Sequence, residues 1–212
     1  MTDSRDQGEF RFEDALPARS FEGDSFAAES YERVNFAEID LSNKEFDRCS
    51  FTECGFADAD LSGAQFDSCA FSACNLSNPR VDGARFIDIE FARCKVAGLN
   101  FYKLAQSVFD LHFSECRLTS CNFTDIKMKL SGFRNCEIQE CYFQSTFLVA
   151  VDFSGSSFSR TLFHDCDLQK ADFRDAHGYS IDPRTNNVKK AVFSAPDVIS
   201  LLDAFDIVIK NS

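Results

Sequence analysis

Cysteine is the residue type in this chain that is best suited to bind a metal or to act as a nucleophile. Ten cysteines occur among 212 residues, and Cys49, Cys54, Cys69 and Cys74 form the pattern C-x4-C-x14-C-x4-C. Thiolates bind zinc, but structural zinc sites usually pair their cysteines at shorter spacing and on surface loops. The spacing therefore argues against a zinc site.

The other reactive side chains do not form a catalytic set. The sequence shows no nucleophile paired with a base and no glycine-rich phosphate loop. The three histidines fall at outward or terminal positions of the repeat described below: His112, His164 and His177. We predict that the chain is not an enzyme and holds no metal or cofactor.

The elements that must position the cysteines follow a period of five residues. A large apolar residue occurs at every fifth position from Phe21 to Phe101, the frame shifts by two, and the period resumes from Val108 to Phe173. These 31 sites hold 19 of the 25 phenylalanines. Neither a helix, with period 3.6, nor a simple strand, with period 2, has this pattern.

All ten cysteines lie two residues before one of these apolar sites, and alanine also occurs there. Each unit therefore directs one bulky and one small apolar side chain inward and three polar side chains outward. Because a free cysteine behaves as a small buried hydrophobe, this register predicts that the cysteines belong to the core.

The pattern resembles the pentapeptide-repeat family, whose usual unit is A(D/N)LXX. CSFTE, CGFAD, ADLSG and AQFDS are clear instances. The resemblance implies an all-β fold, a right-handed quadrilateral parallel β-helix in which four successive units form one coil. We expect about eight coils over residues 19–177, and a shaft roughly 37 Å tall at about 4.8 Å per coil.

A coil of four units predicts continuous columns of side chains inside the shaft, provided that the two-residue slip near 102–107 is absorbed locally. One column is then entirely aromatic: Tyr31, Phe51, Phe71, Phe91, Phe113, Phe133, Phe153 and Phe173. On a neighbouring face phenylalanine gives way across the slip to smaller residues: Val108, Met128, Leu148 and Leu168. The opposite exchange on another face keeps the cross-section filled.

The slip, YKLAQSVF, is the one irregular point that the sequence predicts in the wall, and it contains Tyr102, Lys103 and Phe109. In the resumed frame Val108 takes the inward position. Phe109 should therefore point outward and pack on the outside of the wall, and contact with a partner is the alternative.

The two ends depart from the repeat. Residues 1–18 should form a lead-in or cap, and residues 178–212 a loop, a short α-helix and a dimerisation tail. Ser194 is a suitable N-cap with Asp197 three residues on. Apolar residues line the helix and the run after it: Val198, Leu201, Leu202, Phe205, Ile207, Val208 and Ile209.

The apolar face of this tail has two interpretations. It could be an intrachain lid on the last coil, or it could be a homodimer contact. We favour the dimer because exposed apolar helix faces are rare on monomers.

Acidic residues crowd the first coils. Residues 22–67 contain 12 acids and three bases, a net charge of −9. Duplex DNA carries about 6–7 charges over the same length of axis, roughly 11 Å. We define the acidic surface, a candidate binding surface for a basic partner, by nine of these residues: Glu32, Glu38, Asp40, Glu45, Asp47, Glu53, Asp58, Asp60 and Asp67. A second interpretation is that the acids keep an exposed β-helix end soluble.

The overall net charge of −12 makes nucleic acid and anionic membranes poor partners. The polar, acidic start carries no apolar stretch typical of a signal peptide, and no apolar run reaches the length of a membrane helix. We expect a cytoplasmic protein with reduced thiols.

The tail segments YSIDP, NNVKKAVFS and LLDAFDI resemble the bacterial pentapeptide-repeat proteins that give resistance to gyrase poisons. These are the albicidin-resistance and microcin-immunity types and, more distantly, the Qnr quinolone-resistance proteins. The resemblance implies a homodimer joined through its C-terminal helix that binds DNA gyrase or topoisomerase IV as a mimic of duplex DNA. The Qnr proteins carry two projecting loops, which this chain lacks, and this difference counts against quinolone protection in particular. The alternative function is a structural or regulatory scaffold for a different cytosolic protein.

Overall fold

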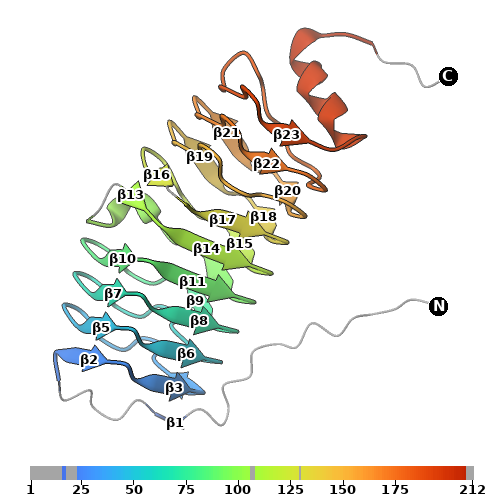
Figure 1. Cartoon of the computed structure of the whole chain (residues 1–212). Coiled ribbons are helices and arrows are strands. Elements are labelled where there is room, and N and C mark those ends of the chain that lie inside the picture. The colour runs from blue at the N-terminus through green and yellow to red at the C-terminus, as the bar shows by residue number, and fades with distance from the viewer. Residues whose placement is uncertain (1–15, 18–22, 106–107, 129, 209–212) are drawn as a thin grey trace, which may run out of the picture.

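The computed structural model describes residues 16–17, 23–105, 108–128 and 130–208. Within these ranges the chain forms a stack of coils, and each strand pairs in parallel with strands one coil earlier or later (Figure 1). The predicted parallel β-solenoid of about eight coils is confirmed. Its strands are short because each face of the shaft is only one repeat unit wide.

We number the four faces in chain order by their inward residues, face 1 beginning at Phe26, face 2 at Tyr31, face 3 at Phe36 and face 4 at Leu41. Face 1 carries β2 (Ser25–Ala27), β5 (Glu45–Asp47), β7 (Gln65–Asp67), β10 (Arg85–Ile87), β13 (Val108–Phe109) and β16 (Lys127–Met128). Face 2 carries β3 (Ser30–Glu32), β6 (Ser50–Thr52), β8 (Ala70–Ser72), β11 (Ile89–Ala92), β14 (Leu111–Ser114), β17 (Gly132–Arg134), β22 (Asp172–Phe173) and β23 (Val192–Phe193).

The other two faces are less regular. Face 3 carries β1 (Leu16–Pro17), β4 (Val34–Asn35), β9 (Asn75–Ser77), β12 (Lys95–Ala97), β15 (Arg117–Thr119), β18 (Glu137–Gln139) and β20 (Ser157–Ser159). Face 4 carries β19 (Tyr142–Gln144) and β21 (Leu162–His164), and single bridges such as Asp40 with Asp60 hold its earlier coils. Two 3-10 helices complete the described chain: η1 (Phe101–Lys103) and η2 (Asp197–Phe205).

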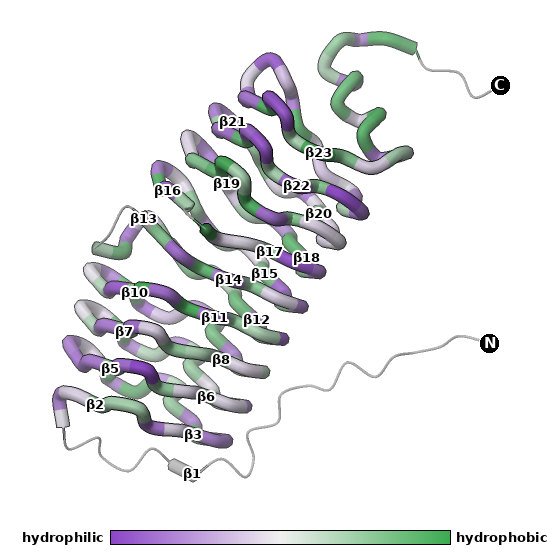
Figure 2. The backbone as a smooth tube through the Cα atoms, viewed as in Figure 1, coloured by the Kyte–Doolittle hydropathy of each residue, from purple (hydrophilic) through white to green (hydrophobic). Residues whose placement is uncertain are grey.

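Stacked rings fill the core. In the face 2 column, Phe91 stacks on Phe113 at 4.8 Å between ring centroids and Phe113 on Phe133 at 4.9 Å, so the column runs through the slip unbroken. Hydrophobic and hydrophilic residues alternate along each coil (Figure 2). The predicted inward and outward registers therefore describe most of the shaft.

The coils turn at two kinds of corner. At the first kind the backbone closes the turn itself, as where the N–H of Ala59 donates to the carbonyl of Phe56 (3.2 Å). At the second kind an N–H donates to a side chain of the next coil, as where the N–H of Cys94 donates to Sγ of Cys116 (3.3 Å). Five cysteines donate their N–H in this way: Cys74, Cys94, Cys136, Cys141 and Cys166. All ten cysteines are buried free thiols.

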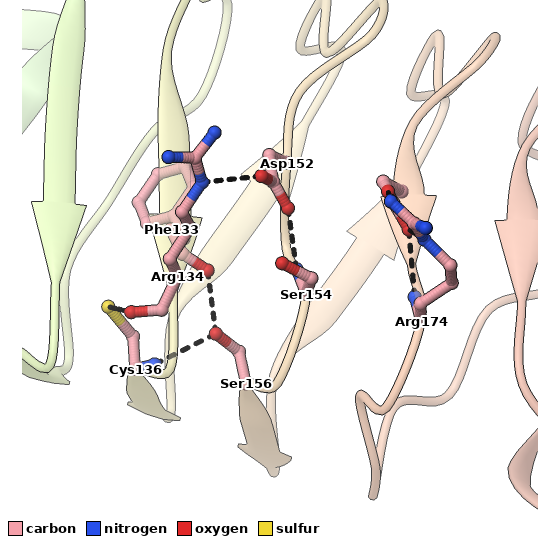
Figure 3. A network of polar contacts seen from close by, with 8 residues as sticks. Phe133, Arg134, Cys136, Asp152, Ser154, Ser156 and Arg174 are labelled. Atoms are coloured by element: carbon pink, nitrogen blue, oxygen red, sulfur yellow. Dashed lines mark hydrogen bonds and ion pairs between the residues drawn. The ribbon is translucent and has the colours of Figure 1, made fainter.

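Hydroxyl groups replace the thiols at some of these corners. Oγ of Ser156 accepts from the N–H of Cys136 (2.9 Å) and donates to the carbonyl of Phe133 (2.6 Å; Figure 3). Thr161 serves the N–H of Cys141 in the same way (3.4 Å). The position two residues before the large apolar site is therefore a hydrogen-bonding position as well as a small core position.

The prediction for Phe109 is wrong. This side chain is buried, and Phe109 pairs in register with Met128, while Val108 pairs with Lys127. Leu104 lies in the small-residue register of the original frame and is buried too, and Phe113 follows Phe109 after only four residues. Relative to a regular spacing of five, the chain has three extra residues between Phe101 and Phe109 and one fewer between Phe109 and Phe113, which gives the net slip of two. Phe109, and not Val108, therefore occupies the interior position.

Parallel pairing continues past residue 177. Phe163 pairs with Ile181, Asp167 with Asn187, and the ring of Phe193 stacks on Phe173 at 5.1 Å. The segment predicted as a loop therefore contributes most of one further coil, and η2 follows it (Figure 1).

The helix η2 is a 3-10 helix and not the predicted α-helix. Its N-cap is Pro196, without a side-chain cap, so the prediction that Ser194 caps the helix is wrong. Oγ of Ser194 instead accepts from the N–H of Asp175 (3.1 Å).

Candidate partner-binding surface

The nine residues of the acidic surface are distributed over all four faces of the first coils. Face 1 carries Glu45, Asp47 and Asp67, and face 2 carries Glu32 and Glu53. The remaining four lie on faces 3 and 4: Glu38, Asp58, Asp40 and Asp60. All nine are exposed or half-buried. The structure therefore brings these acids together as a charged sleeve and not as a one-sided patch.

Like charges are stacked in register between neighbouring coils. Asp47 pairs with Asp67 across β5 and β7, and Asp40 pairs with Asp60 through a bridge. Adjacent like charges on a sheet destabilise it slightly. The stacking of these charges is therefore slightly unfavourable in itself.

A few cations neutralise part of the sleeve. Arg33 Nε lies 2.8 Å from Glu53 Oε2, Arg48 Nη2 2.7 Å from Asp47 Oδ2, and Arg80 Nη1 3.3 Å from Asp60 Oδ2. These ion pairs are exposed and contribute little to stability. They reduce the local charge without removing the acidic excess.

Some of these carboxylates also hold the coil corners. The N–H of Ser42 donates to Asp40 Oδ1 (2.9 Å), and the N–H of Ser62 donates to Asp60 Oδ1 (3.0 Å). Hydrogen bonds from the side chain and the backbone of Ser42 lower the pKa of Asp40. The same device recurs at Asp152 with Ser154 (2.9 Å; Figure 3). These aspartates have a structural role in addition to their charge.

The charge changes sign along the axis. Residues 79–134 contain six acids and nine bases, a net charge of +3, in contrast to the −9 of residues 22–67. A basic groove would attract the first coils and repel the middle ones. The first coils can therefore act as an extended polyanion and the middle coils cannot.

The irregular part of the wall lies at the corner between faces 4 and 1. Tyr102, in η1, is half exposed, and Lys103 Nζ lies 3.1 Å from Asp82 Oδ1. Phe109 is in the core, so of the three predicted residues only Tyr102 and Lys103 are available to a partner.

The apolar side chains of the tail are divided between the last coil and solvent. Leu201 packs against the core and Ser200 Oγ donates to the carbonyl of Tyr179 (3.3 Å), while Val198 is half-buried. Four predicted residues are exposed: Leu202, Phe205, Ile207 and Val208. Ile209 lies outside the described residues. The helix η2 therefore covers the end of the shaft and still presents an apolar surface.

No side-chain cluster in the described part of the chain, counting groups of three or more His, Cys, Asp or Glu, is placed to hold a metal ion. Burial raises the pKa of the Cys69 thiol to about 12 and of Cys166 to about 11, so these thiols are protonated at neutral pH and poor ligands. Across the same residues, no helix is long and apolar enough to cross a membrane.

Two sets of residues escaped the sequence analysis. One is the hydroxyl and amide side chains at the corner positions: Ser131, Thr146, Ser156, Thr161 and Asn186. The other is a group of apolar residues at outward positions: Leu130, Tyr142, Phe147, Val149 and Leu162. Both sets had a signal in the sequence: polar residues at the small-residue position in the first set, and apolar residues at outward positions in the second.

Models of the pentapeptide repeat region match residues 44–110 and 64–143, and the model of eight pentapeptide repeats matches residues 136–175. The chain belongs to the pentapeptide-repeat family. Among curated proteins no sequence matches it.

The comparison with solved structures gives the same fold. This pentapeptide-repeat protein is similar to a trypsin-treated form of QnrB1, a plasmid-mediated fluoroquinolone resistance protein, with a TM-score of 0.59 and 18% identity over 92% of this chain and 98% of the other. HetL, from the cyanobacterium Nostoc and involved in heterocyst differentiation regulation, matches with a TM-score of 0.34 and 13% identity over 79% and 82% of the two chains. Because the identity to QnrB1 is low, that similarity concerns the fold.

Proposed function

We propose that this pentapeptide-repeat protein is a non-enzymatic mimic of duplex DNA that binds DNA gyrase or topoisomerase IV through its acidic surface. The observation that carries the proposal is the charge of −9 over residues 22–67, arranged in register along a narrow shaft. By occupying the basic DNA-binding groove the protein would displace DNA or destabilise poisoned complexes, and so give resistance to gyrase poisons.

Two features of the acidic surface support this proposal. Its carboxylates surround the shaft on four faces, as phosphates surround a duplex, so the protein can enter a groove in several rotational settings. Its charges repeat at the spacing of stacked strands, and the charge per length is comparable to that of DNA, about one per 1.7 Å.

The dimer is part of the proposal. Leu202, Phe205, Ile207 and Val208 form an exposed apolar surface beyond the last coil. A second copy that covers this surface would place the two acidic ends at opposite tips of a longer rod. Each tip could then act as a DNA-like segment.

The test is a gyrase supercoiling assay, with and without a poison, over a titration of this protein. We expect inhibition of supercoiling, or rescue from the poison, at micromolar dimer. The absence of both effects would contradict the proposal.

The matched variants are chosen to leave the corners intact. The variant Asp40→Asn, Asp47→Asn, Asp60→Asn, Asp67→Asn removes four charges and keeps an acceptor oxygen at the corners held by Asp40 and Asp60. The control removes four acids elsewhere: Glu115→Gln, Asp125→Asn, Asp165→Asn and Asp175→Asn. We expect the first to raise the Kd for gyrase at least tenfold and to flatten its salt dependence, and the control to change neither.

The alternative is a scaffold for a different cytosolic protein, and the exposed apolar residues on faces 1 and 4 favour it. A pull-down that recovers another partner and no topoisomerase would support this alternative. Binding to that partner should then be indifferent to the four Asp→Asn changes.

A further inference from the structure

Five apolar side chains are exposed on the two faces that meet at the irregular corner. Leu130, Phe147 and Val149 lie on face 1, and Tyr142 and Leu162 lie on face 4. Tyr142 and Leu162 are direct neighbours in β19 and β21. We define these five residues as the apolar patch, which begins one coil after Tyr102 and Lys103.

The patch has no evident role in folding. Its residues occupy outward positions, and Leu130 is 73% exposed and Phe147 49% exposed. Phe147 pairs with Asp167 of the next coil, where the carboxylate accepts from the N–H of Gln169 (3.3 Å) and so holds the corner. The phenyl ring of Phe147 has no carboxylate oxygen, so it cannot accept the corresponding hydrogen bond at its own corner.

The side chain of Lys127 contacts the exposed ring of Phe147. Lys127 pairs with Phe147 between neighbouring coils, and its Nζ lies 5.3 Å from the ring centroid. This cation–π contact orients an exposed ring at a low entropic cost. Orientation before binding is a feature of residues that anchor protein interfaces.

The net charge around the apolar patch and its exposed area indicate which class of molecule binds there. Residues 127–162 contain four bases and three acids, a net charge of +1. A basic groove is therefore not attracted to the patch, and one net positive charge is too little to hold nucleic acid, which requires several cations. The patch exposes on the order of 300–400 Å² of apolar surface, estimated from the area of each side-chain type. The apolar part of one side of a standard non-obligate interface is about 450 Å², whereas a stable homodimer usually needs more. A non-obligate contact with another protein fits best.

We infer that the apolar patch docks against an apolar surface of the topoisomerase of the proposed function, beside the basic groove that receives the acidic surface. This inference rests on the proposed function and adds a second contact that is not DNA-like. The two contacts are about three to five coils apart, roughly 15–25 Å along the shaft. The patch thus supplies partner specificity that a charged sleeve alone lacks, because any basic groove attracts a sleeve of carboxylates.

The experiment measures gyrase binding by the full chain as a function of salt. The patch variant is Tyr142→Ser, Phe147→Ser. The matched control is Ile87→Ser, Val192→Ser, which removes two apolar residues that are exposed to a similar extent on faces 1 and 2. Thermal unfolding of both variants checks that the shaft is intact.

We expect the patch variant to raise the Kd at least tenfold with the slope of log Kd against log salt unchanged, while the control binds as the wild type does. The four Asp→Asn changes should have the opposite signature, a flatter slope. A patch variant that binds as tightly as the control would overturn the inference and leave the proposed function standing. A wild-type chain that does not bind gyrase at all would overturn both.

Discussion

Cys94 illustrates, at the scale of the residue, what the buried thiols contribute. Its Sγ accepts from the N–H of Cys74 (3.4 Å) and donates to the carbonyl of Phe71 (3.3 Å), joining two coils at one corner. Alanine occupies the same register at Ala64, where the corner closes through its own backbone bond to Leu61 (3.0 Å). The thiol of Cys94 therefore supplies a hydrogen-bond acceptor to the coil before it, which a methyl group cannot do.

We expect Cys94→Ala to lower the free energy of unfolding by about 1–3 kcal/mol, because it leaves the N–H of Cys74 buried without an acceptor. Cys94→Ser should change it by less than about 1 kcal/mol, since a hydroxyl makes the same bonds at Ser156. Urea unfolding of both variants measures the difference. Equal losses for alanine and serine would show that the thiol acts by packing alone.

The protonation of these thiols gives a second prediction. Burial raises the pKa of Cys69 to about 12, whereas the unfolded chain has the ordinary value near 8.5. Because the pKa is higher in the folded state, the contribution of this thiol to the free energy of unfolding is complete below the unfolded-state pKa. It is lost as the pH rises toward the folded-state pKa. By pH 10.5 the loss from Cys69 is about 3 kcal/mol.

We therefore expect the urea midpoint to fall between pH 8 and pH 10.5 in reducing buffer. The variant Cys69→Ser should show a shallower decline over the same range, because serine does not titrate there. An identical decline in the variant would assign the effect to other groups.

At the scale of the element, the shaft depends on left-handed corner residues. Most of these corners accept ordinary side chains, since residues such as Asp58 and Arg93 have positive φ. Gly178 is different, because a Cβ at this position would lie 2.3 Å from the carbonyl oxygen of Phe158. This corner leads into the last coil and so positions η2.

We predict that Gly178→Ala lowers the free energy of unfolding by about 3 kcal/mol or more through backbone displacement. Gly83→Ala is the matched control, because Gly83 also has positive φ (72°) but a Cβ there meets nothing within 4 Å. Its cost should be about 1 kcal/mol. Thermal or urea unfolding of the two variants provides the comparison, and similar costs would contradict the close approach at Phe158.

At the scale of the whole molecule, the ends and the middle of the rod have different surfaces. The first coils are strongly acidic, the middle coils are slightly basic, and the far end is apolar. A dimer through the far end would separate the two acidic regions as far as the rod allows. Mutual repulsion of like charges favours the same arrangement.

We expect the wild-type chain to sediment at twice its mass of 23.9 kDa and the variant Leu202→Glu as a monomer. Leu202 is 39% exposed, so the charge should disrupt the contact without disrupting the fold. Ile87→Glu, a change at a similarly exposed residue far from the tail, is the control and should remain dimeric. Analytical ultracentrifugation decides between these outcomes, and a monomeric wild type would support the interpretation of η2 as a lid.

The period of five could be read directly from the sequence, because it reports which side chains point inward at each unit, and this alternation is local. The faces, the stacking of Phe91 on Phe113 and the burial of every cysteine follow from it. Even the last coil had a visible signal, since Val188 and Phe193 continue the frame of Leu168 and Phe173 one coil later.

The tertiary structure alone decided what happens where the period fails. At the slip, the resumed frame predicted Val108 at the interior position. Phe109 occupies it instead, because the position is set by pairing with Met128 in the next coil. The acidic surface and the apolar patch likewise depend on which residues the coils superpose. Spacing along the chain determines the register of each unit, but only the packing of successive coils determines which outward side chains become neighbours.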